Sequence, residues 1–197
     1  MNEPDTNKPE LDERIKGHKG LGLIQLFEGH GKGKSTAALG TAIRAMGAGH
    51  NVAIVYFDKG GTHYFEREML AKCPELISVH ATGRDRIDPV TGRFDFEITD
   101  IDKTEGARGL AIVEEIFNKN QHQLVILDEI NSSADLGIVD VKEVLKLIDK
   151  KPSGVELILT GRDAPEALRE RAHLITEMKL KKHYFYSGVG AREGIDY

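Results

Sequence analysis

The fold of this chain is decided by the stretch Glu28-Gly29-His30-Gly31-Lys32-Gly33-Lys34-Ser35-Thr36. An apolar run over residues 21–27 leads into it, and a helical pattern over residues 37–46 leads out of it. A strand, a glycine-rich turn and a Gly-Lys-Ser sequence that opens a helix form the layout of a phosphate-binding loop. We therefore predict that this stretch holds phosphate groups of a ligand.

The residue types in the loop suit that role. Glycines at 29, 31 and 33 let the backbone turn so that successive N–H groups point toward one anion. The helix that begins at about Lys34 adds unpaired N–H groups and the positive end of its dipole. Lys34 supplies a positive charge for phosphate oxygens, and Ser35 supplies a hydroxyl that can bind Mg²⁺.

One position departs from the usual pattern, because phosphate-binding loops normally have a glycine where this chain has Glu28. A carboxylate at this position has to point away from a bound phosphate or approach it through a metal ion.

A second informative segment is Leu124-Val125-Ile126-Leu127-Asp128-Glu129. Four apolar residues followed by two acids predict a buried strand whose carboxyl end carries carboxylates. In an open parallel sheet, ligands bind outside these ends. The segment has the pattern of a Walker B strand, so we expect Asp128 and Glu129 to reach the Mg²⁺ held by Ser35, directly or through water.

The rest of the chain alternates strands with helices. Apolar runs predict further strands at residues 52–57, 77–80, 155–159 and 174–178, and helical patterns lie at 63–72, 99–118 and 140–150 and after Pro165. This alternation predicts a doubly wound α/β fold with a mainly parallel sheet of five or six strands, like that of P-loop NTPases. We expect a flexible tail over residues 1–18 and a single domain over residues 19–197.

Composition narrows the function classes. The chain has 197 residues, and its net charge of −5 argues against nonspecific binding to nucleic acid or to an anionic membrane. Its single cysteine, Cys73, excludes an intrachain disulfide, and its histidines form no cluster with zinc spacing. No apolar run approaches the ~20 residues of a membrane span, and the acidic N-terminus is unlike a signal peptide. We therefore expect a cytoplasmic protein.

Taken together, these residues predict a Mg²⁺-dependent protein that binds a nucleoside triphosphate. They do not say which bond of the nucleotide breaks. A kinase, an ATPase and an alkyl transferase all need the same phosphate site, and a protein that binds ATP without turnover is compatible with it too.

Several segments resemble those of the P-loop ATP:corrinoid adenosyltransferases, the family that makes adenosylcobalamin. The resemblance covers residues 14–197 and is carried by residues 29–38, 125–131, 159–165, 176–179 and 182–197. Members of this family also lack the first glycine of the loop and usually have threonine at that position.

This resemblance implies a reaction in which the corrinoid, as Co(I), attacks the 5′ carbon of ATP and tripolyphosphate leaves. It implies Lys34, Ser35 and Glu129 as catalytic residues, and Ser35, Asp128 and Glu129 as the metal site. The ATP-binding residues that it implies are Gly29, His30, Gly31, Lys32, Gly33, Lys34, Ser35, Thr36, Arg44 and Arg162. For Arg44, an ion pair on the surface is the alternative. A phosphotransferase or ATPase acting at the γ-phosphate, and a non-catalytic homologue that binds ATP or a corrinoid, stay open as alternative functions.

The resemblance also implies a corrinoid site. Family members place Phe and Trp, two residues apart, under the corrin ring, where they displace the lower axial ligand. This chain has Phe94 and Phe96 in a loop of the right location and no tryptophan, and the alternative is a hairpin with core-facing phenylalanines. Asn131 completes the implied corrinoid-binding set. A homodimer and a reduced flavoprotein as electron donor are implied as well.

Overall fold

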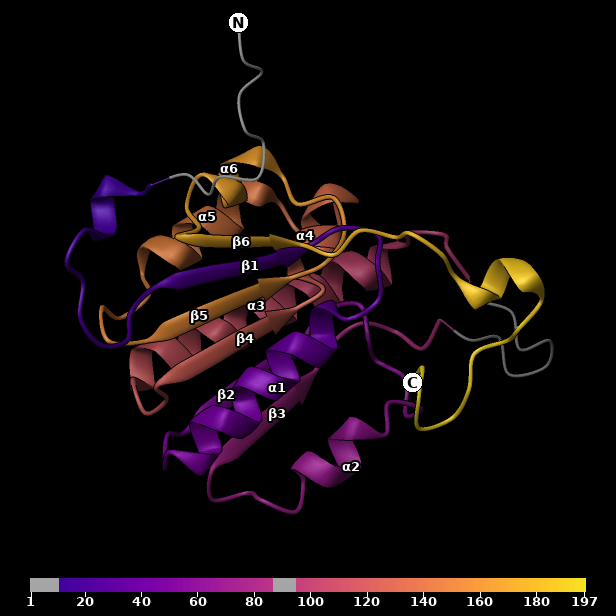
Figure 1. The fold of residues 1–197 in the computed structure, drawn as a ribbon, viewed down its shortest axis with the longest axis horizontal. Coiled ribbons are helices and arrows are strands. Elements are labelled where there is room, and N and C mark those ends of the chain that lie inside the picture. The colour runs from indigo at the N-terminus through magenta and orange to yellow at the C-terminus, as the bar shows by residue number, and fades with distance from the viewer. Residues whose placement is uncertain (1–10, 87–94) are drawn as a thin grey trace, which may run out of the picture.

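The centre of the molecule is a six-stranded sheet in the order β3-β2-β4-β5-β1-β6, and every paired strand runs parallel to its neighbour (Figure 1). The computed structural model describes residues 11–86 and 95–197. The strands are β1 (Ile24–Glu28), β2 (Val52–Tyr56), β3 (Ile77–Ala81), β4 (Leu124–Asp128), β5 (Glu156–Thr160) and β6 (Leu174–Glu177). The predicted parallel α/β sheet is therefore confirmed.

Helices cover both faces of this sheet, as in a doubly wound fold (Figure 1). They are α1 (Lys34–Gly47), α2 (Glu66–Leu70), α3 (Asp100–Lys119), α4 (Ile130–Asp135), α5 (Val141–Asp149) and α6 (Glu166–Arg169), with 3₁₀ turns η1 (Glu13–Ile15) and η2 (Tyr184–Ser187). Helices α1 and α2 pack on one face, and α3 to α6 contribute to the core on the other.

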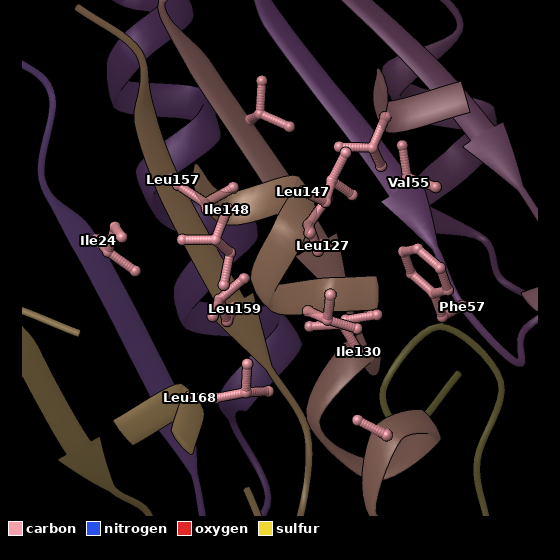
Figure 2. Packing of buried hydrophobic residues seen from close by; sticks show 14 of the residues in the cluster. Ile24, Val55, Phe57, Leu127, Ile130, Leu147, Ile148, Leu157, Leu159 and Leu168 are labelled. Atoms are coloured by element: carbon pink, nitrogen blue, oxygen red, sulfur yellow. The ribbon is translucent and has the colours of Figure 1, made fainter. Parts of the chain in front are cut away.

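The strands have nearly continuous apolar sequences because both faces of the sheet are covered. In β2, Val52 and Ile54 join the core beneath α1, whereas Val55 joins the opposite core. Figure 2 shows that second core, in which Leu127 of the sheet lies near Leu147 of α5. Burying each such side chain stabilises the fold by about 1.5–3 kcal/mol, so the two cores fix the sheet firmly beneath the loops.

Parallel strands bring all their carboxyl ends to one edge of the sheet. The loop after Glu28, the segment after Tyr56, and the acids at Asp128 and Glu129 therefore meet there. The turn after Thr160 joins them at the same edge. This is the placement that the sequence predicts for the phosphate-binding loop and the acidic strand.

The structure differs locally from the predictions. The helix expected at residues 63–72 is reduced to α2, and Tyr64, which precedes it, packs its ring at 4.5 Å from the Arg67 guanidinium. The short helix α4 is not predicted, since its Asn-Ser-Ser-Ala-Asp sequence has low helix propensity. By contrast, α3 matches the helix predicted at residues 99–118, and Thr99 and Asp102 form a capping box at its start.

In the N-terminal part of the described chain, Arg14 contacts the domain. The guanidinium group of Arg14 donates to the carbonyl oxygens of Glu170 at 2.6 Å and Ala172 at 2.9 Å. The division between a tail and a domain near residue 18 stays a prediction. Within residues 11–86 and 95–197, no helix is long and apolar enough to cross a membrane.

Candidate functional site

The loop between β1 and α1 is tightly constrained by its neighbours. Gly29 and Gly33 adopt positive φ angles of 96° and 121°, a region that favours glycine. A Cβ atom at Gly29 or Gly31 would lie 2.7 or 2.5 Å from the carbonyl oxygen of Met178, which is too close for a side chain. The amide of Gly31 donates to that same oxygen at 2.6 Å. The loop is thus held against the end of β6, and its backbone leaves no room for side chains there.

Lys34 begins α1 and folds its side chain back under the loop. Its Nζ donates to the carbonyl oxygens of Gly29 at 2.7 Å and Gly31 at 2.9 Å. Burial lowers the pKa of Lys34. Because an ammonium group has three N–H donors, one remains for a ligand. The charge is therefore already in place for a phosphate oxygen.

Glu28 points away from the interior of the loop. Its Oε2 accepts a hydrogen bond from Nε of Arg169 at 3.0 Å and lies 2.8 Å from Nη2 of the same residue. Arg169 belongs to α6, whose core lies on the face of the sheet opposite α1. This pairing explains how a carboxylate is accommodated at the first position of the loop, since its charge faces a guanidinium group instead of the anion site.

The acids at the end of β4 are held by a shared hydroxyl group. Asp128 accepts from the hydroxyl groups of Ser35 at 3.2 Å and Thr160 at 2.6 Å. The oxygen of Thr160 accepts from the backbone N–H of Glu129 at 3.0 Å. Burial raises the pKa of Asp128, but the Lys59 ammonium and the two hydroxyl donors lower it by a larger amount. The net pKa therefore lies below its ordinary value. Asp128 is therefore ionised beside Ser35 at neutral pH.

Three oxygen-bearing side chains form the candidate metal site, namely Ser35, Asp128 and Glu129. The carboxylate of Glu129 accepts from the hydroxyl of Ser132 at 2.5 Å. These are hard oxygen ligands of the kind that Mg²⁺ prefers. Among the described residues, no group of three or more His, Cys, Asp or Glu side chains could hold a metal. The residues fit a cation that takes its other ligands from phosphates and water, as Mg²⁺ usually does.

Lys59 is a site residue that the sequence interpretation missed. Its Nζ lies 2.5 Å from Oδ2 of Asp128, 3.1 Å from Oγ of Ser35 and 3.5 Å from Oε1 of Glu129. Burial lowers the pKa of Lys59, but the two carboxylates raise it more, and the net pKa lies above its ordinary value. Lys59 lies in the segment after β2, but no motif in the sequence marks it.

A cavity of ≈ 730 Å³ opens over the loop. Its wall contains residues 30–36 of the loop together with Lys59, Glu129 and Arg162. The volume falls within the roughly 300–1,000 Å³ of typical small-molecule sites. The structure thus brings most of the predicted ATP-binding residues, including Arg162 from the turn after β5, around one space.

The C-terminal segment, residues 183–197, forms another part of this wall. Lys32 of the loop pairs with the carboxylate of Asp196 and donates to the carbonyl oxygen of Ile195 at 2.7 Å. Arg192 donates to Asp196 at 3.0 Å, and Tyr184 contributes a further hydrogen bond. These donors hold the pKa of Asp196 well below its usual range, and Arg192 has the largest effect. The segment has no periodic pattern, so nothing in the sequence predicted this contact.

Several predicted residues lie away from the cavity. Arg44 is exposed on α1, roughly 15 Å along the helix from Lys34 at 1.5 Å per residue. Phe96 is 82% exposed, so the core-facing alternative is wrong for this residue. Asn131 is fully buried, and its amide nitrogen donates to the carbonyl oxygen of Phe27 at 3.4 Å. Phe94 lies outside the described residues. The ligand contacts expected for these four residues stay predictions.

Comparison with known proteins identifies the family. The family model described as ATP:corrinoid adenosyltransferase BtuR/CobO/CobP matches residues 20–197. The chain belongs to this family. The corrinoid adenosyltransferase of Pseudomonas aeruginosa is 32% identical over 98% of this chain and 93% of its own length. That of a Sinorhizobium species is 35% identical over 89% of this chain and 80% of its own. The corrinoid adenosyltransferase CobA of Salmonella typhimurium is 32% identical over 96% of this chain and 93% of its own length.

Family membership confirms the predicted identity, a corrinoid adenosyltransferase that uses ATP. Among solved structures, a KaiC-like protein from Pyrococcus horikoshii OT3 superposes with a TM-score of 0.53 at 19% identity, over 83% of this chain and 75% of that one. At this identity the likeness bears on the fold alone. It supports the predicted α/β architecture of the adenosyltransferase.

Proposed function

We propose that this adenosyltransferase moves the 5′-deoxyadenosyl group of ATP onto the Co(I) centre of a reduced corrinoid, and that residues 29–36 hold the departing tripolyphosphate. The observation that carries the proposal is the convergence of Lys34, Ser35 and Asp128 beneath one cavity. In the reaction, the electron pair of Co(I) forms the cobalt–carbon bond while the bond between C5′ and its phosphate oxygen breaks.

The residues of the cavity act mainly on the leaving group. Negative charge builds on the triphosphate as it departs, and the loop amides and Lys34 stabilise it electrostatically. Lys32 and Arg162, which line the same cavity, add positive charge. Mg²⁺ held by Ser35 with Asp128 and Glu129 would supply further charge neutralisation. Holding the cobalt in line with C5′ supplies the remaining part of the rate enhancement.

The corrinoid side of the proposal rests on family resemblance. Phe94 and Phe96 would lie against the corrin ring, which suits the exposed, apolar ring of Phe96. The roles that the resemblance implies for Asn131 at the corrinoid and for Arg44 at the nucleotide belong to the same proposal, although neither residue lines the cavity. A homodimer, a reduced flavoprotein donor and a cytoplasmic location belong to the same proposal.

The product of the reaction tests the proposal directly. Purified protein is incubated with Mg-ATP and chemically reduced corrinoid, and the products are separated by chromatography. We expect a light-sensitive adenosylated corrinoid and tripolyphosphate in equal amounts, and neither product when the reductant is omitted. Formation of ADP without an adenosylated corrinoid would instead indicate a phosphotransferase or ATPase. Binding of ATP and corrinoid without any product would indicate a non-catalytic homologue.

A further inference from the structure

The three oxygens proposed for the divalent cation are already in contact with a positive charge from the protein. The ammonium group of Lys59 lies 2.5 Å from Asp128, 3.1 Å from Ser35 and 3.5 Å from Glu129. Its side chain is only 14% exposed, and that of Asp128 only 2%. The ammonium therefore neutralises a buried carboxylate that would otherwise be costly to leave unpaired.

We propose that Lys59 is a positioning residue that occupies the cation site in the nucleotide-free enzyme and turns to the triphosphate when metal and nucleotide bind together. This inference rests on the metal role proposed above for Ser35 and Asp128. Its physical basis is repulsion, because two cations at the same oxygens repel each other by several kcal/mol even at an effective dielectric constant of about 20. A divalent cation can therefore bind these oxygens well only after the ammonium has left them.

The backbone around Lys59 is held in place independently of its side chain. Arg67 donates to the carbonyl oxygens of Lys59 and of Gly61, the latter at 2.9 Å. Its guanidinium group packs at 4.5 Å from the ring centroids of both Tyr56 and Tyr64. This arrangement anchors the segment after β2 from outside the metal site.

The Lys59 side chain would move toward the cavity that contains the phosphate-binding loop. Lys59 and Tyr64 both line the cavity that contains Lys34 and the loop. The ammonium lies 5.7 Å from the Tyr64 ring centroid, so the ring flanks it at the cavity wall. A triphosphate in the cavity would attract the ammonium away from Asp128 and would bring its own cation to the vacated oxygens. Metal and nucleotide would then enter as a pair.

The variant Lys59→Met tests this exchange, because methionine keeps an unbranched side chain and removes the charge. Binding of Mn²⁺ is followed by the electron paramagnetic resonance signal of the free ion, first alone and then with ATP present. We expect the affinity for Mn²⁺ alone to rise at least about tenfold, and the affinity for ATP with Mn²⁺ to fall about tenfold. Lys59→Arg, which keeps the charge, should show no rise. Lys103→Met, an exposed change on α3, is the matched control.

In Lys59→Met, the affinity for Mn²⁺ alone should rise while the affinity for ATP with Mn²⁺ falls. A purely structural role of Lys59 would instead weaken both affinities. An affinity for Mn²⁺ alone that stays unchanged or falls in Lys59→Met overturns the inference. If the wild-type protein binds no Mn²⁺ even with ATP, both the proposed metal role and the inference fail. Normal wild-type binding with no gain in Lys59→Met rejects the inference alone.

A measurement on the wild-type protein does not depend on how the variant folds. Lysines are acetylated with acetic anhydride and quantified by mass spectrometry, with Lys103 as the internal reference. Saturating Mn²⁺ should release Lys59 from its carboxylates and raise its rate of acetylation several-fold, and adding ATP should lower that rate again. A rate that responds to neither addition would overturn the inference.

Discussion

Replacing Asp102 with asparagine tests whether a buried group of ion pairs supports the corrinoid side of the enzyme. The side chain of Asp102 is 0% exposed. It accepts hydrogen bonds from Arg84 Nε at 3.0 Å and Arg86 Nη2 at 3.1 Å. It also accepts from the amide of Thr99 at 2.7 Å and from its hydroxyl at 2.8 Å. Asp102 therefore caps α3 and pairs with two guanidinium groups, each of which has a second carboxylate partner, Asp95 for Arg84 and Asp58 for Arg86.

The magnitude follows from burial. Removing one partner of a buried ion pair costs about 3–5 kcal/mol when the other charge is left unpaired. Since Arg84 keeps Asp95 as a partner and Arg86 keeps Asp58, we expect at most the lower end of this range, about 3 kcal/mol. At about 2–4 °C per kcal/mol for a chain of this size, the melting temperature should fall by roughly 6–12 °C.

The dependence on pH gives a second, independent check. Burial raises the pKa of Asp102, but the bonds from Thr99 and the charges of Arg86 and Arg84 lower it more, so the net pKa is depressed. A folded-state pKa below the unfolded value means that this stability is fully present above about pH 4 and is lost as the pH falls further. The difference between wild type and Asp102→Asn should therefore be largest at neutral pH and shrink below about pH 4.

Urea unfolding followed by circular dichroism at pH 7 and at pH 3.5 measures both effects. Asp100→Asn is the control, because Asp100 is an exposed acid in the same first turn of α3 and should cost at most about 1 kcal/mol. A loss below about 1 kcal/mol for Asp102→Asn at pH 7, or a difference that persists unchanged in acid, would refute this account.

The same Asp102→Asn variant should affect the KM values of the two substrates differently. Arg84 also donates to the Asp95 carboxylate at 2.7 Å and to the Glu97 carbonyl oxygen at 2.6 Å, on either side of Phe96. Loss of Asp102 should therefore raise the KM for corrinoid more than the KM for ATP. Equal increases would show that the ion pairs do not support the corrinoid site in particular.

Three further substitutions test individual residues. Lys34→Ala should lower kcat by about 10²–10³-fold in the adenosylation assay, the usual loss for one key electrostatic donor, and near-normal turnover would place the triphosphate elsewhere. Phe96→Ala should slow the reaction that starts from Co(II) and a reductant more than the reaction with preformed Co(I). Equal losses in those two assays would remove its role at the corrin ring. Asp196→Asn should release the C-terminal segment from Lys32 and raise the KM for ATP several-fold, whereas an unchanged KM would show that this contact does not shape the nucleotide site.

The parts of the site that the sequence predicts are those with a local pattern. The loop at residues 29–36 and the strand ending in Asp128 carry their own signals, because each depends on residues adjacent in the chain. Lys59 and the Asp196 contact lack such a signal. Lys59 reaches Asp128 across 69 positions of sequence, and Lys32 reaches Asp196 across 164. Only the order of the strands and the path of the C-terminal segment bring these groups together.

Glu28 shows how a departure from a motif is compensated through the tertiary structure. The sequence indicates that its carboxylate must avoid the phosphates, but its partner Arg169 lies 141 positions away and belongs to a helix with weak sequence signals. With this position paired to Arg169, the anion site begins at Gly29, whose φ of 96° and contact with Met178 permit no side chain. The first glycine of the usual motif is therefore dispensable here, because the strict requirement for glycine has moved to the next residue of the loop.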